Sequence, residues 1–416
     1  MRDAIVIGSG LAGLTTALRL ARGGMSVSLL SKGPGGLQLS QGTIDILGYA
    51  PDRVTRPLDA LGDFAAGHPG HPYGLLGADT VRDAAGFLAE LLPDLLVGDP
   101  EVNLQLPTAV GAVRPTALAQ ESMAAGDLKD GASYVIVGLR RLKDFQADLI
   151  AGNLDRAEVP AGGAVSARAV TIDVPVRDER DTTGLTYARA LDDPSVRATF
   201  AKAVAKEVRA GEIVGLPGIL GLDDHEAWRD VQQIVDHPVF EIPLPPPGVP
   251  GLRLYRTLSA IARDEGVRFI TGSKVIDKRV EGDRVVSVSI DSAGRAREYA
   301  ARHFVFAPGG FESGALAVDS YGAISETTFG LPLTESSAEK LIHGDYWGSE
   351  QQLFEVGVRV DESMRVLDAD SAPVHSNFYA AGGLLAGAMR WSEKSGDGIA
   401  AASAVRAADT ILREGN

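Results

Sequence analysis

The chain has 416 residues, no cysteine and a formal net charge of −15 at pH 7. Without cysteine it can form no disulfide, no cysteine-ligated zinc site and no iron–sulfur cluster, and we predict no metal site. The negative charge argues against a nucleic-acid-binding surface, which needs clustered Lys and Arg, and the length predicts two domains or one domain with a large insertion.

The sequence predicts neither a secretory leader nor a membrane-spanning helix. An apolar strand begins within four residues of Met1, which leaves no room for a secretory signal. The apolar run FLAELLPDLLV at 87–97 is interrupted by charged residues and proline, and it falls short of the roughly 18 apolar residues of a membrane-spanning helix. We therefore expect a soluble, cytoplasmic protein that makes any membrane contact through a partner.

Residues 4–30 predict a strand, a glycine turn, a helix and a second strand. Gly8, Gly10 and Gly13 stand between the first strand and the helix. In this setting the first glycine permits a tight turn, the second lets backbone approach a phosphate, and the third lets the helix pack on the strand. The helix N-terminus adds free N–H groups and a partial positive charge. This pattern favours a bound nucleotide, with a purely structural glycine turn as the alternative.

The middle of the chain, about 91–250, predicts short strands and helices. SYVIVGL at 133–139 has the composition of a strand. A helix over 81–92, capped near Asp79, precedes this section. The section closes with the proline cluster EIPLPPPGVPG at 241–251, which we expect to be neither helix nor central strand.

The last part of the chain predicts an antiparallel meander, a further strand and a final helix. Residues 266–311 alternate short β-type runs with EGD and SAG turns, and they end in an apolar strand that runs into Gly309-Gly310. FYAAGGLLAG at 378–387 predicts a strand entering a glycine turn, and GDGIAAASAVRAADTILRE at 396–414 predicts an alanine-rich helix.

This order of elements resembles that of FAD-linked reductases of the succinate dehydrogenase and fumarate reductase type, which complete a discontinuous cofactor domain in the same way. The resemblance implies an α/β fold: a discontinuous Rossmann-like flavin-binding domain, with a parallel sheet and a β-meander, plus an inserted α/β domain. We assign 1–90, 251–315 and 355–416 to the flavin-binding domain, 91–250 to the inserted domain, and 316–354 to a smaller insertion.

The same resemblance implies where a flavin lies. The helix that begins near 396 would point its N-terminus at the flavin pyrimidine, where negative charge develops on reduction, although an ordinary capped helix is the alternative. The connection at 33–39 holds neither His nor Cys, so we expect a noncovalent flavin. The glycine loops and the resemblance together predict these cofactor-binding residues: Gly8, Gly10, Leu11, Ala12, Gly13, Ser31, Lys32, Ser40, Gln41, Gly42, Thr43, Val275, Gly309, Gly310, Gly382, Gly383, Gly398 and Ile399.

Five longer strings resemble the B subunit of anaerobic glycerol-3-phosphate dehydrogenase. They are HPYGLLG at 71–77, LPTAVGAVRPTALAQESMAAGDL at 106–128, GLRRLKDFQADLIAGNL at 138–154, LPGILGL at 216–222 and EIPLPPPGVPGLRLYRTL at 241–258. The resemblance implies a subunit of a glycerol 3-phosphate:quinone oxidoreductase, which forms dihydroxyacetone phosphate. Electrons would pass through the flavin and a membrane-associated iron–sulfur subunit to quinone. The resemblance also implies a second flavoprotein subunit. It further implies that a partner subunit holds this chain at the inner face of the membrane.

The identity of the flavin depends on Ser31-Lys32, which end the second predicted strand. A dinucleotide-binding unit usually places an acidic residue there, to accept hydrogen bonds from a ribose. A serine hydroxyl and a cation form a weaker clamp, and one phosphate satisfies a helix N-terminus as readily as two. The B-subunit resemblance also implies FMN, which we therefore predict. FAD is the alternative, because relatives of the succinate dehydrogenase type combine Ser-Lys with FAD.

Spacing alone does not assign the catalytic groups. Oxidation of a secondary alcohol needs a base for the hydroxyl proton and cations for a phosphate. A turn histidine, surface salt bridges and an aromatic interface anchor are the alternative roles for the residues concerned. The candidates are His71, Arg253 and Arg390, with Arg114 and Arg140 as further cations and Trp391 as a stacking residue.

Two other functions remain open at this point. The chain is either a stand-alone FAD-dependent dehydrogenase or reductase of a small hydroxy or keto acid, or a non-catalytic electron-relay or assembly subunit. One departure from the expected pattern bears on them: AGAMRWSEKSGDGIA at 386–400 replaces a glycine-rich, often cysteine-containing approach to the final helix.

Overall fold

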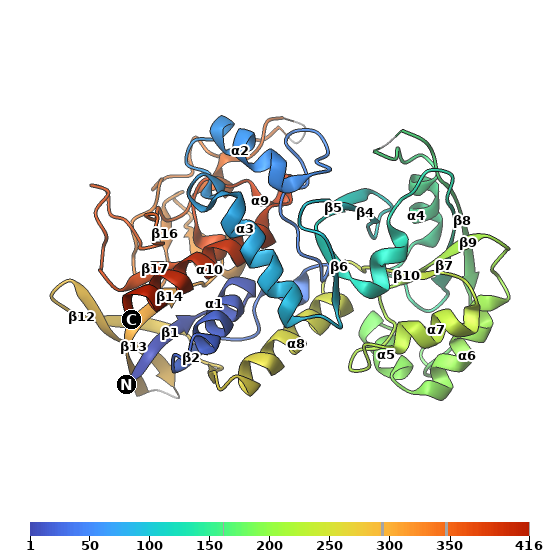
Figure 1. Cartoon of the computed structure of the whole chain (residues 1–416), viewed down its shortest axis with the longest axis horizontal. Helices are drawn as coiled ribbons and strands as arrows, with labels where there is room; N and C mark the ends of the chain where they lie inside the picture. The colour runs from blue at the N-terminus through green and yellow to red at the C-terminus, as the bar shows by residue number, and fades with distance from the viewer. Residues whose placement is uncertain (161, 293–294, 346–347, 416) are drawn as a thin grey trace.

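The computed structural model describes residues 1–160, 162–292, 295–345 and 348–415. The chain forms two parts that lie side by side (Figure 1). One is built from the first, third and last sections of the chain, and the other from the middle section. Each part has its own cluster of buried apolar side chains.

The larger part is organised around a seven-stranded sheet in the order β11-β2-β1-β14-β13-β12, with β17 also paired to β14. The strands β1, β2, β11 and β17 all run parallel to their neighbours. The strands are β1 Arg2–Ile7, β2 Val27–Ser31, β11 Arg268–Thr271, β12 Val275–Glu281, β13 Arg284–Ser292, β14 Arg295–Phe306 and β17 Phe378–Ala380.

Strand β14 belongs to two kinds of sheet. Its first half pairs antiparallel with β13, up to the pair Ser287 and Ala300. From Ala301 onward it pairs parallel with β1, and its end also pairs parallel with β17. The carboxyl ends of β1, β2, β14 and β17 therefore meet at one edge of the sheet, which is where ligands bind in open α/β sheets.

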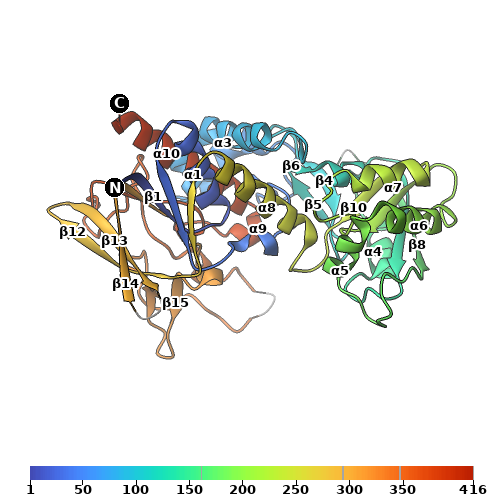
Figure 2. The same ribbon diagram turned by 90° about the horizontal axis from the view of Figure 1, so that it is seen from below.

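Four helices cover the larger sheet. α1 contacts α8 and α10, and α10 also contacts α3; Figure 2 shows them on one side of the molecule, with β15 on the other. They are α1 Leu11–Arg22, α3 Pro72–Leu91, α8 Val249–Asp264 and α10 Gly396–Gly415. The remaining elements here are α2 Pro57–Gly67, α9 Arg390–Glu393, β15 Leu316–Val318 and β16 Ile324–Glu326.

The middle section forms a four-stranded sheet in the order β10-β9-β7-β8, with every pair parallel. Its strands are β7 Ser133–Leu139, β8 Ser166–Ile172, β9 Glu212–Pro217 and β10 Val239–Ile242. Its helices are α4 Ala147–Leu154, α5 Gly184–Leu191, α6 Pro194–Ala205 and α7 Ala227–Val235. Two small sheets, β3 Leu96–Gly98 with β6 Leu118–Gln120 and β4 Leu104–Pro107 with β5 Val113–Thr116, join it to the larger part.

The predicted fold class is confirmed: a parallel sheet continued by a meander, plus a second α/β unit. The turn predicted at 292–294 lies partly outside the described residues. The residue numbers of the domain division remain a proposal, and the two apolar clusters support a middle unit between about 113 and 249. Among the described residues, no helix is both long and apolar enough to cross a membrane.

Two local predictions were wrong. α3 begins at Pro72, well before 81, because His71 caps it and the chain passes through a non-helical residue, Gly77, before the predicted segment. The first residues of the proline cluster belong to β10, which is an edge strand as the prediction allows. The end of the cluster, however, belongs to a helix, since α8 begins at Val249 with Pro250 in its first turn. Proline is well suited to that position, because the N–H it lacks would have no partner within the helix.

Candidate functional site

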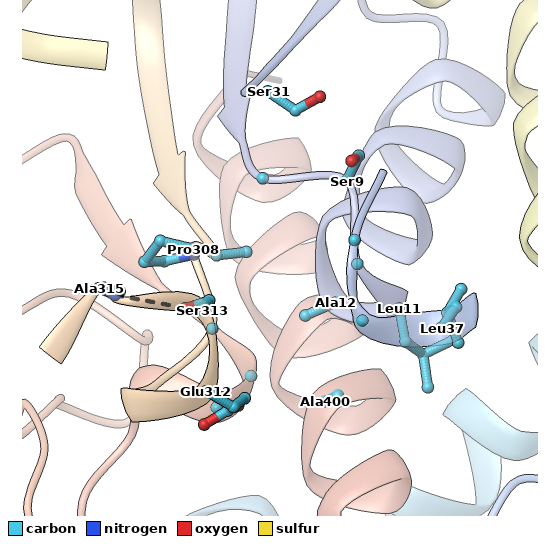
Figure 3. A pocket seen from close by; sticks show the side chains of 18 of the residues that line it. Ser9, Leu11, Ala12, Ser31, Leu37, Pro308, Glu312, Ser313, Ala315 and Ala400 are labelled. Carbon is cyan, nitrogen blue, oxygen red and sulfur yellow. Dashed lines mark hydrogen bonds between the residues drawn. The ribbon is translucent and has the colours of Figure 1, made fainter. Parts of the chain in front are cut away.

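A cavity of about 1280 Å³ lies at the carboxyl ends of the parallel strands. Its walls come from the β1–α1 turn, the loop after β2, the loop after β14, the turn after β17 and the start of α10. Figure 3 shows Ser31 at one end of the view and Glu312 and Ala400 at the other, with Ser9 and Ala12 between them. The volume exceeds the range of about 300–1,000 Å³ that is typical of small-molecule pockets, so a ligand as large as a dinucleotide can fit.

The three glycines of the turn after β1 serve two different functions. Gly8 has a φ of 115°, and a Cβ there would lie 2.0 Å from the carbonyl oxygen of Ala307. A Cβ on Gly13 would lie 2.0 Å from the carbonyl oxygen of Gly8. Gly10 differs, because a Cβ there would meet no described atom within 4 Å. The outer two glycines thus allow close packing of backbone, whereas the middle one faces the open cavity.

The N-terminus of α1 faces this cavity with the features of an anion site. Gly10 is its N-cap residue, and among the described residues no side chain caps the helix and no acid lies in its first turn. Gly10, Leu11 and Ala12 all line the cavity. Free N–H groups and the positive end of the helix dipole would therefore stabilise a phosphate placed there.

The side chain of Ser31 independently indicates a polar ligand at its end of the cavity. It ends β2, lines the cavity and is 7% exposed. Its Oγ is buried and has no hydrogen-bond partner in the described part of the chain. A buried hydroxyl without a partner is unfavourable, so a ribose hydroxyl or another polar ligand atom at this end would satisfy it.

The N-terminus of α10 forms part of the opposite end of the cavity. Gly396, Asp397 and Ala400 line the wall, but Gly398 and Ile399 do not. The N–H groups of Gly398 and Ile399 are already used, since they donate to the carbonyl oxygens of Asp45 (2.8 Å) and Ser395 (3.0 Å). Of the residues expected at this helix start, Gly396 and Asp397 therefore line the cavity, whereas Gly398 and Ile399 do not, and Ala400 lines it in addition.

Arg390 is the one catalytic candidate that lines the cavity. Its guanidinium lies against Gly383 and Gly310, where a Cβ would come within 2.1 Å and 2.9 Å of its nitrogens. It pairs with Glu312 at 3.5 Å. Trp391 also lines the cavity, is 54% exposed, and makes an edge contact with Phe354. A cation and an aromatic pair therefore border this end.

The predicted cofactor residues divide into two groups. The cavity is lined by Gly8, Gly10, Leu11, Ala12, Ser31, Lys32, Ser40, Val275, Gly309, Gly382 and Gly383. The others, Gly13, Gln41, Gly42, Thr43, Gly310, Gly398 and Ile399, are absent from its lining. Gly42 illustrates why. It has a φ of 78° and packs against Pro250 of α8 and Gln120 of β6, so it lies away from the cavity. A flavin contact from these residues remains a prediction.

The other catalytic candidates lie away from the cavity. Arg253 is 3% exposed and binds both oxygens of the buried Glu241 carboxylate. Arg114 binds Asp45 through two nitrogens. Arg140 is an exposed residue of the middle unit, 3.8 Å from Asp173. Arg253 and Arg114 are thus engaged in internal ion pairs, and none of the three arginines lines the cavity.

His71 is fixed in a buried network. Its Nδ1 accepts a hydrogen bond from the backbone N–H of Tyr73, which leaves the proton of a neutral ring on Nε2. Nε2 then donates to Glu393 at 3.1 Å. Burial raises the pKa of Glu393, but hydrogen bonds from His71 and Ser395 outweigh it and leave that pKa below its usual value. Because Glu393 ends α9, this network positions the segment that carries Arg390.

Several lining residues were not predicted. The loop after β14 contributes Pro308, Glu312, Ser313 and Ala315 (Figure 3). Thr327 and Lys274 also line the cavity. The string FESGA directly after Gly309-Gly310 is a sequence signal for the first set, because polar residues that follow a parallel strand lie at its carboxyl edge.

The comparisons with known proteins agree with this geometry. A family model described as "FAD binding domain" matches residues 3–399, and the chain belongs to this family of flavoproteins. The glycine turn, the uncapped start of α1 and the unpartnered Ser31 hydroxyl fit a flavin nucleotide. The family match thus supports a flavin as the cofactor of this chain.

Full-length relatives narrow the family further. The B subunit of a probable anaerobic glycerol-3-phosphate dehydrogenase from Halobacterium salinarum is 34% identical over 96% of this chain and 95% of its own length. The B subunit of the anaerobic glycerol-3-phosphate dehydrogenase from Pectobacterium atrosepticum is 29% identical over 100% of this chain and 99% of its own. The chain belongs to the family of these B subunits.

Solved structures give weaker likenesses. A 3-ketosteroid Δ1-dehydrogenase from Sterolibacterium denitrificans is 13% identical with a TM-score of 0.48, covering 99% of both chains. A flavocytochrome c3 fumarate reductase in an open conformation is 11% identical with a TM-score of 0.48, covering 99% of this chain and 78% of its own. These scores carry no argument about function.

Replacement of Gly10 by leucine is expected to abolish flavin retention while the protein still folds. The added side chain meets no described protein atom at its Cβ, and Gly10 has an ordinary φ of −75°, so it would fill only ligand space. Flavin absorbance per chain measures the effect. Gly62→Leu is the matched control, because Gly62 is equally uncrowded but lies on exposed α2. Full flavin content in folded Gly10→Leu would remove this turn from the site.

Replacement of His71 by alanine is expected to lower the free energy of unfolding by about 3 kcal/mol at pH 7, because Glu393 then stays buried without its main partner. In the wild type, the lowered pKa of Glu393 gives a stabilisation that is present above pH 4.5 and disappears as the pH falls through the folded-state pKa. The variant should lose this acid-sensitive part. Denaturant unfolding at pH 3 to 7 tests it, with His237→Ala as control. Unchanged stability in His71→Ala would contradict the network.

Proposed function

We propose that this chain is the flavin-carrying B subunit of an anaerobic glycerol 3-phosphate:quinone oxidoreductase. The main support for this proposal is the match to B subunits over nearly the full chain. The cavity at the sheet edge, which is large enough for a dinucleotide, agrees with it. The substrate is glycerol 3-phosphate, the product is dihydroxyacetone phosphate, and the electrons go on to quinone. A second flavoprotein subunit and a membrane-associated iron–sulfur subunit complete the assembly at the inner face of the membrane.

The chain's own residues hold the cofactor and shape the space beside it. The N-terminus of α1 binds phosphate through the N–H groups around Gly10, and Ser31 binds a ribose hydroxyl. The flavin, when bound, accepts the two electrons of the oxidation. Lys274 and Arg390 supply positive charge in the lining, and the carboxylates of Glu312 and Asp397 are its candidate proton acceptors. His71 acts only at a distance, by fixing α9.

We further propose that the flavin is FAD, the alternative to the FMN prediction. One cavity extends from Ser31 and Lys32, past the N-terminus of α1, to Arg390 and Asp397. FMN bound with its phosphate at α1 and its ring toward α10 would leave the Ser31 end without a ligand. The unpartnered Ser31 hydroxyl therefore favours an adenosine at that end.

The flavin released by acid denaturation is expected to be FAD, at one per chain, with no colour left in the precipitate. Ser31→Ala should weaken FAD binding about 2–10-fold, as loss of one hydrogen bond predicts, and leave FMN binding unchanged. The same substitution should not destabilise the flavin-free protein, because it removes a buried hydroxyl without a partner. Chromatography of the flavin and titration of the apoprotein decide this, and an FMN peak would restore the FMN prediction.

The electron-relay function remains the second candidate, and the position of the cationic candidates favours it. Arg114 and Arg253 are engaged in buried or half-buried ion pairs, and Arg390 is shared with Glu312. The described cavity lining contains no histidine. Of the candidate arginines only Arg390 lines the cavity, and it is shared with Glu312, so a partner subunit would add to the binding of a substrate phosphate or provide it entirely.

We expect the isolated, FAD-loaded chain to turn over glycerol 3-phosphate poorly with artificial acceptors, and quinone reduction to require the partner subunits. The chain has no cysteine, so it carries no iron–sulfur cluster to take electrons from the flavin. Anaerobic mixing with glycerol 3-phosphate, followed by flavin absorbance, measures the first step. Rapid bleaching would assign substrate oxidation to this chain. Quinone reduction by the chain alone would contradict the requirement for partners.

A further inference from the structure

Asp397 occupies an unusual position for a carboxylate. It lies in the first turn of α10, is partly buried and lines the cavity beside Gly396 and Ala400. In the described part of the chain its carboxylate has a single hydrogen bond, a long one of 3.4 Å from the backbone N–H of Asp45. Most of its hydrogen-bonding capacity is therefore available to water, a proton or a ligand in the cavity.

A second carboxylate lies behind it. Asp45 is 1% exposed, and its oxygens are bound by Arg114, Thr43 (3.2 Å) and Thr116. Arg114 is thus the counter-ion of Asp45, and Asp397 shares that charge only from a greater distance. Two acids with one cation between them favour a proton on the less well bound acid.

The remaining charged and titratable groups around Asp397 are already paired. From α3, the Tyr73 hydroxyl donates to the carbonyl oxygens of Ile46 and Ser395. From α9, Glu393 binds His71, while Arg390 pairs with Glu312. Lys394 lies near Arg114 and Asp45, and it donates to the carbonyl oxygen of Trp391. Asp397 also lies at the positive end of the α10 dipole, which stabilises the charged carboxylate.

Burial, followed by the charge of Asp45, raises the pKa of Asp397 to about 7, against the opposing charge of Arg114. Both forms are therefore populated near neutral pH. Any further negative charge in the cavity would raise this pKa again, because like charges disfavour the carboxylate.

We propose that Asp397, where it is ionised, takes up a proton from water when the flavin bound in this cavity gains two electrons, and releases it when they leave. The balance is two electrons and two protons: the electrons and one proton go to the flavin, and the second proton converts the carboxylate to a carboxylic acid. The proposal rests on the bound flavin, but not on glycerol 3-phosphate as the reductant.

Redox titration of the flavin-loaded chain between pH 6 and 8, with an electrode and mediators, tests this coupling. One proton per two electrons contributes about 30 mV per pH unit. Above about pH 7, where most of Asp397 is ionised before reduction, the midpoint potential of the wild type should fall more steeply with pH than that of Asp397→Asn, by up to this amount. Asp409→Asn is the matched control, because Asp409 lies on the same helix and pairs with Arg19. Equal slopes in the wild type and Asp397→Asn would overturn the proposal.

Two further readouts keep the test valid if Asp397→Asn binds flavin poorly. Infrared difference spectra of the wild type, recorded on reduction by dithionite, should show a new protonated carboxyl band, and its absence would overturn the proposal. In the flavin-free protein, a raised pKa means that the folded state holds more protons than the unfolded state from about pH 4 to 7, so stability falls as pH rises. The Tm advantage of Asp397→Asn over the wild type should therefore grow between pH 5 and 8; a constant difference counts against it.

Discussion

The contact between the β1–α1 turn and the end of β14 is the constraint on which the rest of the site depends. A Cβ on Gly8 would lie 2.0 Å from the carbonyl oxygen of Ala307, and one on Gly13 would lie 2.0 Å from that of Gly8. Strand, turn and helix are therefore packed backbone to backbone. This packing fixes the N-terminus of α1 at the sheet edge, with Gly10 free to face a phosphate.

β14 explains how distant sections of the chain reach this contact. Its first half closes the meander, and its second half inserts between β1 and β17. Because β14 pairs with both, the first glycine turn, Gly309 and Gly382 all border one cavity although they are far apart in sequence. Long-range pairing of this kind costs loop-closure entropy, which the shared apolar core offsets.

The sequence predicted the parts of the site that depend on backbone conformation. Glycine positions such as Gly8 and Gly382 were found because a turn at the end of an apolar strand has a clear local pattern. The start of α10 at Gly396 was predicted correctly, but Gly398 and Ile399 lie outside the cavity lining, because their position depends on tertiary hydrogen bonds such as that from the Gly398 N–H to the carbonyl oxygen of Asp45. Local pattern does not contain that partner.

Side-chain functions were harder to predict because their partners are remote. His71 is a helix cap bonded to Glu393, 322 residues away. Arg253 pairs with Glu241, which is only 12 residues away in the same proline-rich string but belongs to β10 of the middle unit. Spacing along the chain cannot show which charges are neutralised by such pairs.

The Arg253 network also links the middle unit to the flavin site. Arg253 on α8 binds Glu241 and donates to the Gln120 side chain (3.2 Å), and Gln120 in turn donates to the carbonyl oxygens of Pro250 (2.7 Å) and Gly42 (3.3 Å). Gly42 lies three residues before Asp45, whose N–H binds Asp397 at the cavity wall. Buried polar networks are costly unless every member is satisfied. This chain of contacts therefore connects β10 of the middle unit with the segment beside Asp397 at the start of α10.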